Sequence, residues 1–426
     1  MTAIQSSTPL SETSSAATVL GQPFTFRRGG FTAKNRLLKS AMSEGLASPT
    51  HAPTAAHEKL YATWALGGLG LAITGNVMVD RRALGEPGNV VVEDERDLAA
   101  LTRWASAAKQ DGCRVWMQIN HPGKQSPTFL SREPVAPSAV PLGAGLEGAF
   151  ATPRALEPHE IEELVERFAT TAAVAQKAGF DGVQIHGAHG YLVSQFLSPH
   201  HNRRDDAWGG TLEKRARFGL AVLAAMRRAV GERFPIGIKI NSADFQRGGF
   251  SEEESLEVIR MLADGGIDLV EVSGGNYEAP AMTGAEIRES TRQREAYFLA
   301  FAERVRAAVK VPLALTGGFR TAEGMASAVS SGAVDLVGLA RALALEPELP
   351  RRVLSGEAFV SRVRPLSTGI RKVDQLTALD VSWYENQLAR IGAGKAPDPG
   401  LGEWRSAIES VARLGLAATR MRRARA

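Results

Sequence analysis

The chain has 426 residues, of which 44% are hydrophobic and 23% are charged, and its formal net charge at pH 7 is +4. This composition excludes global disorder, and so small a net charge gives no reason to expect a nucleic-acid partner. The one cysteine, Cys113, excludes a disulfide framework and any four-cysteine zinc or iron–sulfur site within this sequence.

The N-terminal segment, Met1–Gly21, is rich in Ser, Thr and Ala. It has neither the basic start and apolar run of a signal peptide nor the arginines of a transit peptide, so we expect a flexible leader. No stretch of about 18 apolar residues follows it, and we therefore expect no membrane-spanning segment and a cytoplasmic protein.

Short apolar runs recur along residues 22–350 and predict β-strands. The predicted strands are Arg36–Met42, Leu69–Asn76, Arg114–Asn120, Phe180–His186, Pro235–Asn241, Ile267–Ser273, Val311–Thr316 and Val334–Leu339. Strands that are apolar almost throughout are typical of a parallel sheet that is covered on both faces.

Amphipathic stretches between these runs predict helices. They are Ala55–Leu66, Leu98–Lys109, Pro158–Ala178, Leu212–Val230, Glu252–Ala263, Glu295–Val309 and Thr321–Ser330. Gly179, Gly266 and Gly332 stand where a predicted helix meets the next strand, the position at which glycine ends a helix in a left-handed conformation.

Alternating strands and helices leave two architectures open, a doubly wound open sheet and a closed (β/α)8 TIM barrel. An open sheet binds its ligand at one switch point. Here, chemically suggestive residues follow nearly every strand: Ser43, Gly75, Asn76, Gln118, His186, Lys239, Ser273, Gly317, Gly318 and Arg341. Only a closed barrel brings all eight C-terminal strand ends to one mouth, so we predict the TIM barrel.

Four segments lie outside the repeating pattern. His121–Glu157, Gly187–Gly210 and Gly274–Arg294 are insertions that follow strands, so we expect them on the mouth side, where they could cover a ligand. Residues 351–426 predict a C-terminal helical extension, with one helix near Val381–Ile391 and another from Glu403. Its basic end is more typical of a solvated helix face or a contact in a homo-oligomer than of a nucleic-acid or lipid site.

The most chemically informative group is His186, His189 and Tyr191, which leaves the predicted mouth within a few residues. Imidazoles can donate hydrogen bonds to a carbonyl oxygen, and a tyrosine with a pKa near 10 keeps a proton that it can donate. This set suits a reaction in which charge grows on an oxygen while a carbon is protonated. The alternatives are satisfied mouth-lining side chains, or a metal site, which would lack an adjacent carboxylate.

The run from His186 to Tyr191, followed by Gln195–Pro199 and by Asn202, Arg204 and Asp206, resembles the signature of the old yellow enzyme family of FMN-dependent ene reductases. The resemblance covers about Pro23–Leu345. It implies a TIM barrel that holds FMN non-covalently and takes electrons from NADH or NADPH. It also implies that the activated C=C bond of an enone or nitro compound is reduced, with hydride from flavin N5.

The resemblance also implies roles for particular residues. His186 and His189 match the pair that binds the substrate oxygen, and Tyr191 matches the proton donor. The positions that match the flavin site are Ser40, Ala41, Met42, Ser43, Gly75, Gln118 and Lys239 around the ring, and Gly317, Gly318, Ala340 and Arg341 at the phosphate. No metal is expected.

Some positions depart from the family pattern. Lys239 replaces the usual arginine near flavin N1, and Ser43 replaces threonine or cysteine, which leaves the redox potential open. An unpaired ammonium on Lys239 would be costly in a crowded mouth, which favours a role at the cofactor. Gly45 stands where one bacterial branch has a second active-site tyrosine, so that branch's substrate preference cannot be copied here.

Three other functions remain as alternatives. A dienoyl-CoA or amine dehydrogenase of the same superfamily would carry an iron–sulfur cluster, which Cys113 alone cannot hold. A metal-dependent TIM-barrel hydrolase would use His186 and His189 as ligands. A flavin carrier without activity would not explain why His186, His189 and Tyr191 occur together at the mouth.

Overall fold

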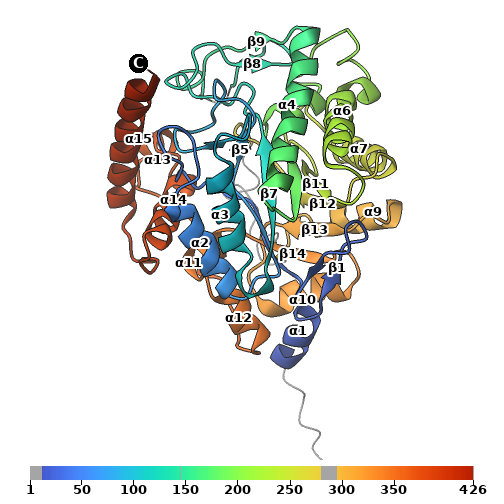
Figure 1. The fold of residues 1–426 in the computed structure, drawn as a ribbon, viewed down its shortest axis with the longest axis vertical. Helices are drawn as coiled ribbons and strands as arrows, with labels where there is room; N and C mark the ends of the chain where they lie inside the picture. Colours follow the sequence, from blue (N-terminus) through green and yellow to red (C-terminus); the bar gives the residue numbers. More distant parts are fainter. Residues whose placement is uncertain (1–11, 144, 280–294, 426) are drawn as a thin grey trace, which may run out of the picture.

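The computed structural model describes residues 12–143, 145–279 and 295–425, and its centre is a parallel sheet that closes on itself. The barrel strands are β3 (Leu37–Lys39), β4 (Leu71–Ile73), β7 (Arg114–Asn120), β10 (Gly182–Gly187), β11 (Ile236–Asn241), β12 (Leu269–Ser273), β13 (Leu313–Thr316) and β14 (Leu336–Leu339). They pair in chain order, and β14 pairs with β3, so the ring has no free edge. The predicted (β/α)8 TIM barrel is confirmed (Figure 1).

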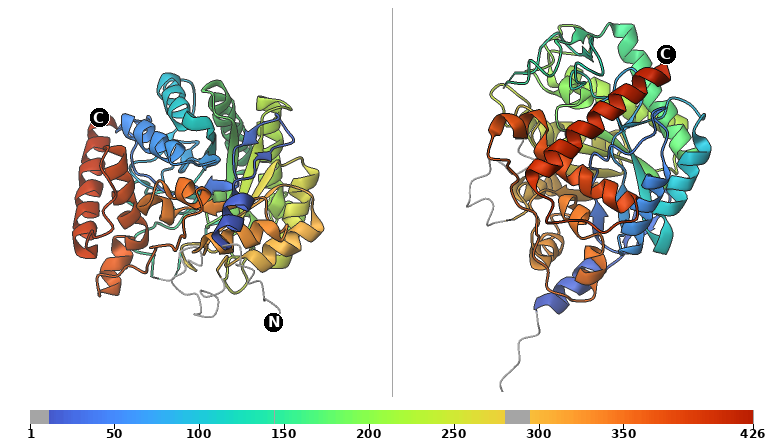
Figure 2. Two further views of the ribbon diagram at one scale, coloured as in Figure 1. Left: turned by 90° about the horizontal axis from the view of Figure 1, so that it is seen from below. Right: turned by 90° about the vertical axis from the view of Figure 1, so that its left-hand side faces the viewer.

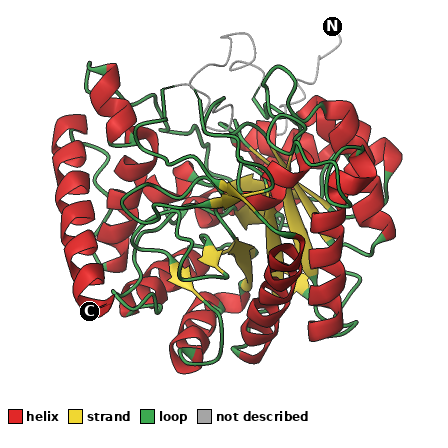
Figure 3. Ribbon diagram, turned by 90° about the horizontal axis from the view of Figure 1, so that it is seen from above, coloured by secondary structure: helices red, strands yellow, loops and turns green. Residues whose placement is uncertain are grey.

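Helices surround the strands, as Figure 3 shows. They are α2 (Ala55–Leu66), α3 (Leu98–Ala108), α4 (Pro158–Lys177), α6 (Leu212–Val230), α7 (Glu252–Asp264), α9 (Leu299–Ala308) and α10 (Ala322–Ser330), with the short α11 (Arg341–Leu345) and α12 (Leu349–Leu354) after β14. In α4, Ile161, Leu164, Val165 and Phe168 are all buried. This spacing places them on one helix face, which packs against the barrel and α6.

The N-terminal end of the barrel is closed by a small hairpin, β1 (Phe24–Thr25) paired with β2 (Thr32–Ala33). The ring of Phe26 packs 5.0 Å from that of Trp116, centroid to centroid, and both belong to a buried apolar cluster inside the strands. Because this end is a packed plug, the polar residues that follow the strands face the opposite, C-terminal end.

The structure corrects the predicted leader. Glu12–Leu20 forms helix α1, in which Ala16 and Leu20 are buried and which contacts α10 and α12. Two apolar residues four apart on one face are enough to dock a short helix, but they are a weak signal among Ser, Thr and Ala. Residues 1–11 of the predicted leader lie outside the described residues.

The described parts of the insertions lie on the mouth side, as expected. The first contains β8 (Val135–Ala136) and β9 (Arg154–Ala155), and the second contains α5 (Leu192–Leu197). β5 (Val77–Met78) and β6 (Val90–Val91) extend the sheet beside β7, and a 3-10 turn, Gln110–Gly112, precedes β7. Of the third insertion, residues 280–294 lie outside the described residues.

The C-terminal extension consists of α13 (Arg371–Leu376), α14 (Leu379–Gly392) and α15 (Glu403–Arg425). α14 packs against α2, α11 and α15, and Trp383 Nε1 donates a hydrogen bond to the carbonyl of Leu401 at 2.9 Å. Figures 1 and 2 show α14 and α15 side by side at one flank of the barrel. Among the described residues, no helix combines the length and the apolar character that crossing a membrane requires.

Candidate active site

A cavity of about 250 Å³ lies at the C-terminal mouth of the barrel. Ten residues predicted from the sequence line it: Ser40, Ala41, Met42, Ser43, His189, Lys239, Gly317, Gly318, Ala340 and Arg341. Further lining residues that the sequence did not single out are Tyr297 and Phe298, which precede α9, and Asp380, Val381 and Tyr384 of α14. The extension therefore contributes to the wall of the cavity.

The predicted catalytic side chains contact one another beside this cavity. His186 Nε2 lies 3.3 Å from His189 Nδ1, and the ring centroid of His186 lies 4.6 Å from that of Tyr191. The outer nitrogens are also held, since His186 Nδ1 lies 2.9 Å from Asn76 Oδ1 and His189 Nε2 lies 2.8 Å from Ser273 Oγ. Asn76 and Ser273 follow β4 and end β12, so several strands together orient the two imidazoles.

The backbone at His189 takes an unusual conformation, with φ at +60°. This left-handed region is costly for a residue that has a Cβ, so the surroundings must hold it. The backbone N–H of His189 donates to Asn241 Oδ1 at 3.1 Å, and His189 forms an isolated bridge with Asn276. The last residue of β11 and a residue that follows β12 thus hold the backbone that carries this imidazole.

Burial sets the charge of all three groups. It lowers the pKa of His186 well below its ordinary value and that of His189 to about 3, and the nearby Lys239 adds to both shifts. Burial, then the nearby Tyr277, raises the pKa of Tyr191 well above its ordinary value. At neutral pH both imidazoles are therefore neutral, each with one N–H, and Tyr191 carries its proton.

Lys239 has a partner within the protein, so the cost of an unpaired ammonium no longer argues for a role at the cofactor. Its Nζ lies 3.2 Å from Glu271 Oε1, and the two side chains are 2% and 0% exposed. Glu271 Oε2 accepts a hydrogen bond from Gln184 at 2.7 Å, and Gln184 Oε1 accepts one from Gln118 at 2.7 Å. Lys239 and Glu271 lie opposite each other on the paired strands β11 and β12. The carboxylate within a buried strand was therefore a sequence signal from which this ion pair could have been predicted.

Gln118 ends this network with an unmet acceptor. Its Oε1 is buried and has no hydrogen-bond partner in the part of the chain that the structure describes. A buried amide oxygen of this kind is costly unless a bound group donates to it. The position predicted to bind the pyrimidine edge of a flavin therefore offers an acceptor that suits a ring N–H.

Gly75 does not line the cavity, and neither do Gln118, His186 and Tyr191. The backbone N–H of Gly75 donates to Glu44 Oε1 and Tyr61 Oη, both at 3.1 Å. Lys39 Nζ also donates to Tyr61 Oη at 3.0 Å, and to the carbonyl of Ile73 at 2.9 Å. Lys39, Glu44 and Tyr61 thus form a buried hydrogen-bonded cluster next to the segment 40–43. The sequence analysis did not predict this cluster.

The segment after β13 can hold a phosphate. Gly317 and Gly318 have φ values of +112° and +88°, and a Cβ on Gly318 would lie 2.6 Å from the ring of Tyr297. Only glycine fits this close approach with positive φ. Arg341 lies at the same end of the cavity, with its guanidinium 5.8 Å from the ring centroid of Tyr384. Backbone amides beside an arginine suit an anion.

These residues fit FMN in their chemistry. An unmet acceptor at Gln118 suits the ring, and the cation of Lys239 lies beside the cavity. A glycine pair with Arg341 suits the phosphate.

The pattern of the NADH:flavin oxidoreductase / NADH oxidase family matches residues 20–358. The chain belongs to this family. It is similar to the NADH-dependent flavin oxidoreductase iliE of Hypocrea jecorina (strain QM6a), with 40% identity over 352 residues, which cover 77% of this chain and 87% of that protein.

Solved structures agree with this membership. 2-Naphthoyl-CoA reductase superposes with a TM-score of 0.74 at 26% identity, covering 80% of this chain and 53% of that one. The old yellow enzyme homologue from Zymomonas mobilis has a TM-score of 0.67 at 28% identity, covering 81% and 94%. The resemblance noted in the sequence is confirmed, and the protein is an NAD(P)H-dependent flavin oxidoreductase whose cofactor is FMN.

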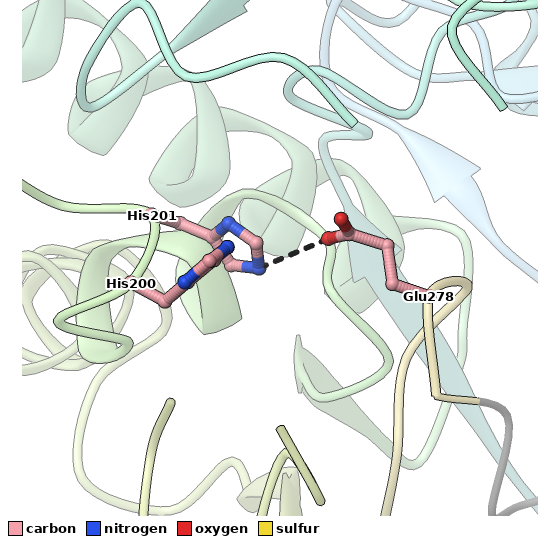
Figure 4. Close-up of side chains that lie close together, drawn as sticks. All are labelled: His200, His201 and Glu278. Atoms are coloured by element: carbon pink, nitrogen blue, oxygen red, sulfur yellow. Dashed lines mark ion pairs between the residues drawn. The ribbon is translucent and has the colours of Figure 1, made fainter. Parts of the chain in front are cut away.

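A second cavity, of about 570 Å³, lies between the insertions and contains none of the predicted site residues. His200 and Glu278 line it, and together with His201 they bring possible metal-ligand atoms within 4.8 Å of one another (Figure 4). His201 Nε2 faces Glu278 Oε2 at 3.5 Å, but its Nδ1 lies 2.9 Å from Lys124 Nζ, which is 4.0 Å from Glu278.

The charges of Lys124 and His201 show what the cluster around Glu278 does. Burial lowers the pKa of Lys124 to about 8 and that of His201 to about 2, so at neutral pH Lys124 is mostly charged and His201 is neutral. The ammonium already supplies the positive charge that Glu278 needs, and Glu278 Oε1 also accepts from the N–H of Gly143 at 2.8 Å. We therefore interpret the cluster as an anchor for the segment that carries Glu278 rather than as a metal centre.

Proposed function

We propose that this flavoprotein reduces the activated C=C bond of α,β-unsaturated carbonyl or nitro compounds. The observation that supports this most directly is the mutual contact of His186, His189 and Tyr191 beside the cavity. Two neutral imidazoles offer hydrogen-bond donors to one oxygen, while a buried phenol offers a proton to a nearby carbon. When bound, FMN would supply the hydride for this reduction, with NADH or NADPH as the source of its electrons.

The two histidines bind and polarise the substrate oxygen. His186 Nε2 and His189 Nδ1 face each other at 3.3 Å, so one acceptor oxygen can be reached by both. In the structure Asn76 Oδ1 faces His186 Nδ1, so His186 is the Nδ1–H tautomer and its Nε2 accepts from His189 Nδ1–H. A substrate oxygen that takes a hydrogen bond from both rings therefore requires His186 to change to its Nε2–H tautomer, with the Asn76 amide turned. Ser273 Oγ can donate to His189 Nε2 and so favours the Nδ1–H tautomer there. Neutral donors in a water-poor site stabilise the charge that develops on the oxygen.

Tyr191 delivers the proton. Because burial keeps the phenol protonated at neutral pH, it is a general acid that acts when negative charge reaches the α-carbon. Tyr297 and Phe298 line the cavity with aromatic surface and limit the access of water to the reacting atoms.

Substitution of Tyr191 by Phe tests the proposal. We expect Tyr191→Phe to slow enone reduction by the pre-reduced enzyme about 10²–10⁴-fold, the scale of a lost general acid. Reduction of the bound FMN by NADH should change little, because that step takes no proton from Tyr191. Anaerobic stopped-flow spectroscopy measures the two half-reactions separately.

His189→Ala provides the comparison for the oxygen-binding role. We expect it to slow enone reduction about 10²–10³-fold and to weaken enone binding as well. If Tyr191→Phe slowed both half-reactions equally, Tyr191 would lose its assigned role. The hydrolase alternative is not favoured, because His186 and His189 bond to each other and join none of the metal-competent groups among the described residues.

A further inference from the structure

Tyr277 meets the proposed proton donor inside the mouth. Its hydroxyl lies 2.9 Å from that of Tyr191, and the ring centroids are 6.0 Å apart at an interplanar angle of 71°. The other polar neighbour of the Tyr191 hydroxyl is Asn76 Nδ2, at the longer distance of 3.5 Å. Within the described part of the chain, Tyr277 therefore makes the closest hydrogen bond to the proton donor.

The segment that carries Tyr277 is held on both sides of it. Asn276 Oδ1 accepts hydrogen bonds from the N–H groups of Glu278 and Ala279, both at 2.9 Å, and Asn276 Nδ2 donates to Gln246 Oε1 at 2.8 Å. Glu278 is fixed by Gly143 and by the cluster with Lys124 and His201 that Figure 4 shows in part. The backbone that carries Tyr277 is therefore held on both sides, and its hydroxyl is held by Tyr191.

A phenol that protonates carbon needs such a partner. As the O–H bond of Tyr191 breaks and a C–H bond forms at the α-carbon, the electron pair of the O–H bond stays on the Tyr191 oxygen and makes it a phenolate. At 2.9 Å either hydroxyl can be the donor, and the raised pKa of Tyr191 fits a resting state in which Tyr191 donates to Tyr277. Once proton transfer makes the Tyr191 oxygen a phenolate, that oxygen can only accept, and the Tyr277 hydroxyl lies within reach to donate to it.

We propose that Tyr277 is the positioning residue of the proton donor: its hydroxyl holds that of Tyr191 through the 2.9 Å contact, and it donates a hydrogen bond to the phenolate that proton transfer leaves behind. The proposal rests on the role proposed above for Tyr191. Burial raises the pKa of Tyr277 to about 12, so its hydroxyl keeps the proton that it donates. The proton that restores Tyr191 comes from solvent.

Kinetics of four proteins test this: the wild type, Tyr277→Phe, Tyr191→Phe and the double variant. We expect Tyr277→Phe to slow enone reduction about 10- to 100-fold, the scale of a hydrogen bond to a charged group, and to leave FMN reduction by NADH unchanged. In the Tyr191→Phe background the same change should have no further effect, because its partner is already absent.

A spectroscopic measurement separates this role from a merely structural one. The chain has five tyrosines, so labelling with 3-fluorotyrosine gives a ¹⁹F spectrum in which each single Phe variant removes and thereby assigns one resonance. We expect Tyr277→Phe to shift the Tyr191 resonance in the FMN-loaded protein without substrate.

Three outcomes would overturn the proposal: an unchanged rate of enone reduction in Tyr277→Phe, an equal loss in the Tyr191→Phe background, or a Tyr191 resonance that does not move. If Tyr191→Phe alone left enone reduction unchanged, the proposed function would fail first. If Tyr191→Phe acted as expected and Tyr277→Phe did not, only the inference about Tyr277 would be wrong.

Discussion

Lys239 and Glu271 form a buried ion pair inside the barrel, next to the cavity. Such a pair contributes little net stability compared with apolar residues of equal size, but it is costly to break, because the remaining charge has no partner. The pair also means that the cation beside the flavin site is partly neutralised. The paired Lys239 therefore presents less positive charge than an unpaired cation would. It also lacks the planar guanidinium with which an arginine makes two parallel hydrogen bonds.

Substitution of Lys239 tests how strongly the stability of the fold depends on the pair with Glu271. We expect Lys239→Met to lower the free energy of unfolding by about 3–5 kcal/mol, since Glu271 would stay buried and uncompensated. Urea unfolding of the FMN-free protein measures the change without a contribution from cofactor binding. The double variant Lys239→Met/Glu271→Leu should recover most of the loss, and an equal loss in both variants would contradict the interpretation.

At the scale of elements, the predicted helices and strands agree with the structure to within a few residues. Gly179, Gly266 and Gly332 have φ values of +90°, +82° and +77°, as predicted for glycines that end helices. α1 was missed because its buried face has few apolar residues in a Ser- and Thr-rich segment.

Helix α15 carries an apolar face that the described part of the chain leaves exposed. Trp404, Ile408 and Val411, spaced four and three residues apart, are 49%, 66% and 55% exposed and lie on one side of the helix. The homo-oligomer expected through the C-terminal extension stays a prediction, and this face is where we place the contact with a second copy.

Polar substitutions on this face test the prediction. We expect the wild type to sediment as an oligomer and Trp404→Ser/Ile408→Ser to sediment as a monomer in analytical ultracentrifugation. Leu376→Ser, at a position that is also exposed but lies on α13, is the matched control and should leave the mass unchanged. A wild type that sediments as a monomer would contradict the prediction.

At the scale of the whole molecule, the extension meets the barrel mouth through charged groups as well. Removal from water, and then the neighbouring carboxylate of Glu385 on α14, raises the pKa of Glu86 well above its ordinary value. Arg413 on α15 lies 3.8 Å from Glu385 and partly offsets the negative charge. Glu86 precedes β6, so this contact joins distant parts of the sequence.

The raised pKa of Glu86 predicts how stability depends on pH. The folded protein keeps a proton that the unfolded chain releases above its ordinary pKa, so this contribution to stability is complete at low pH and is lost as pH rises through the folded pKa. Glu385→Gln removes the neighbouring charge and should make this loss smaller. Urea midpoints at several pH values above about 5 measure the slope.

The matched control for this slope is Glu409→Gln, which changes an exposed surface ion pair with Arg405 on α15. Such pairs contribute little, so its slope should equal that of the wild type. If the slope for Glu385→Gln equalled that of the wild type, the charge of Glu385 would not affect the pKa of Glu86.

The sequence by itself determined the eight strand–helix units, the mouth-side insertions and the helical extension, because each depends on a local period of apolar residues and on breakers at its ends. The sequence also showed that His186, His189 and Tyr191 lie close together, since all three fall within six consecutive residues. The flavin chemistry followed from motifs that match a family.

Only the tertiary structure decided which residues from distant segments touch these groups. The partners Lys239–Glu271 and Tyr191–Tyr277 come from different strands or loops, the second pair 86 positions apart in the chain. Such contacts depend on strand register, barrel closure and loop conformation, which local periodicity does not encode. The same reason explains why periodicity predicted the helix α14 but not which of its side chains line the cavity.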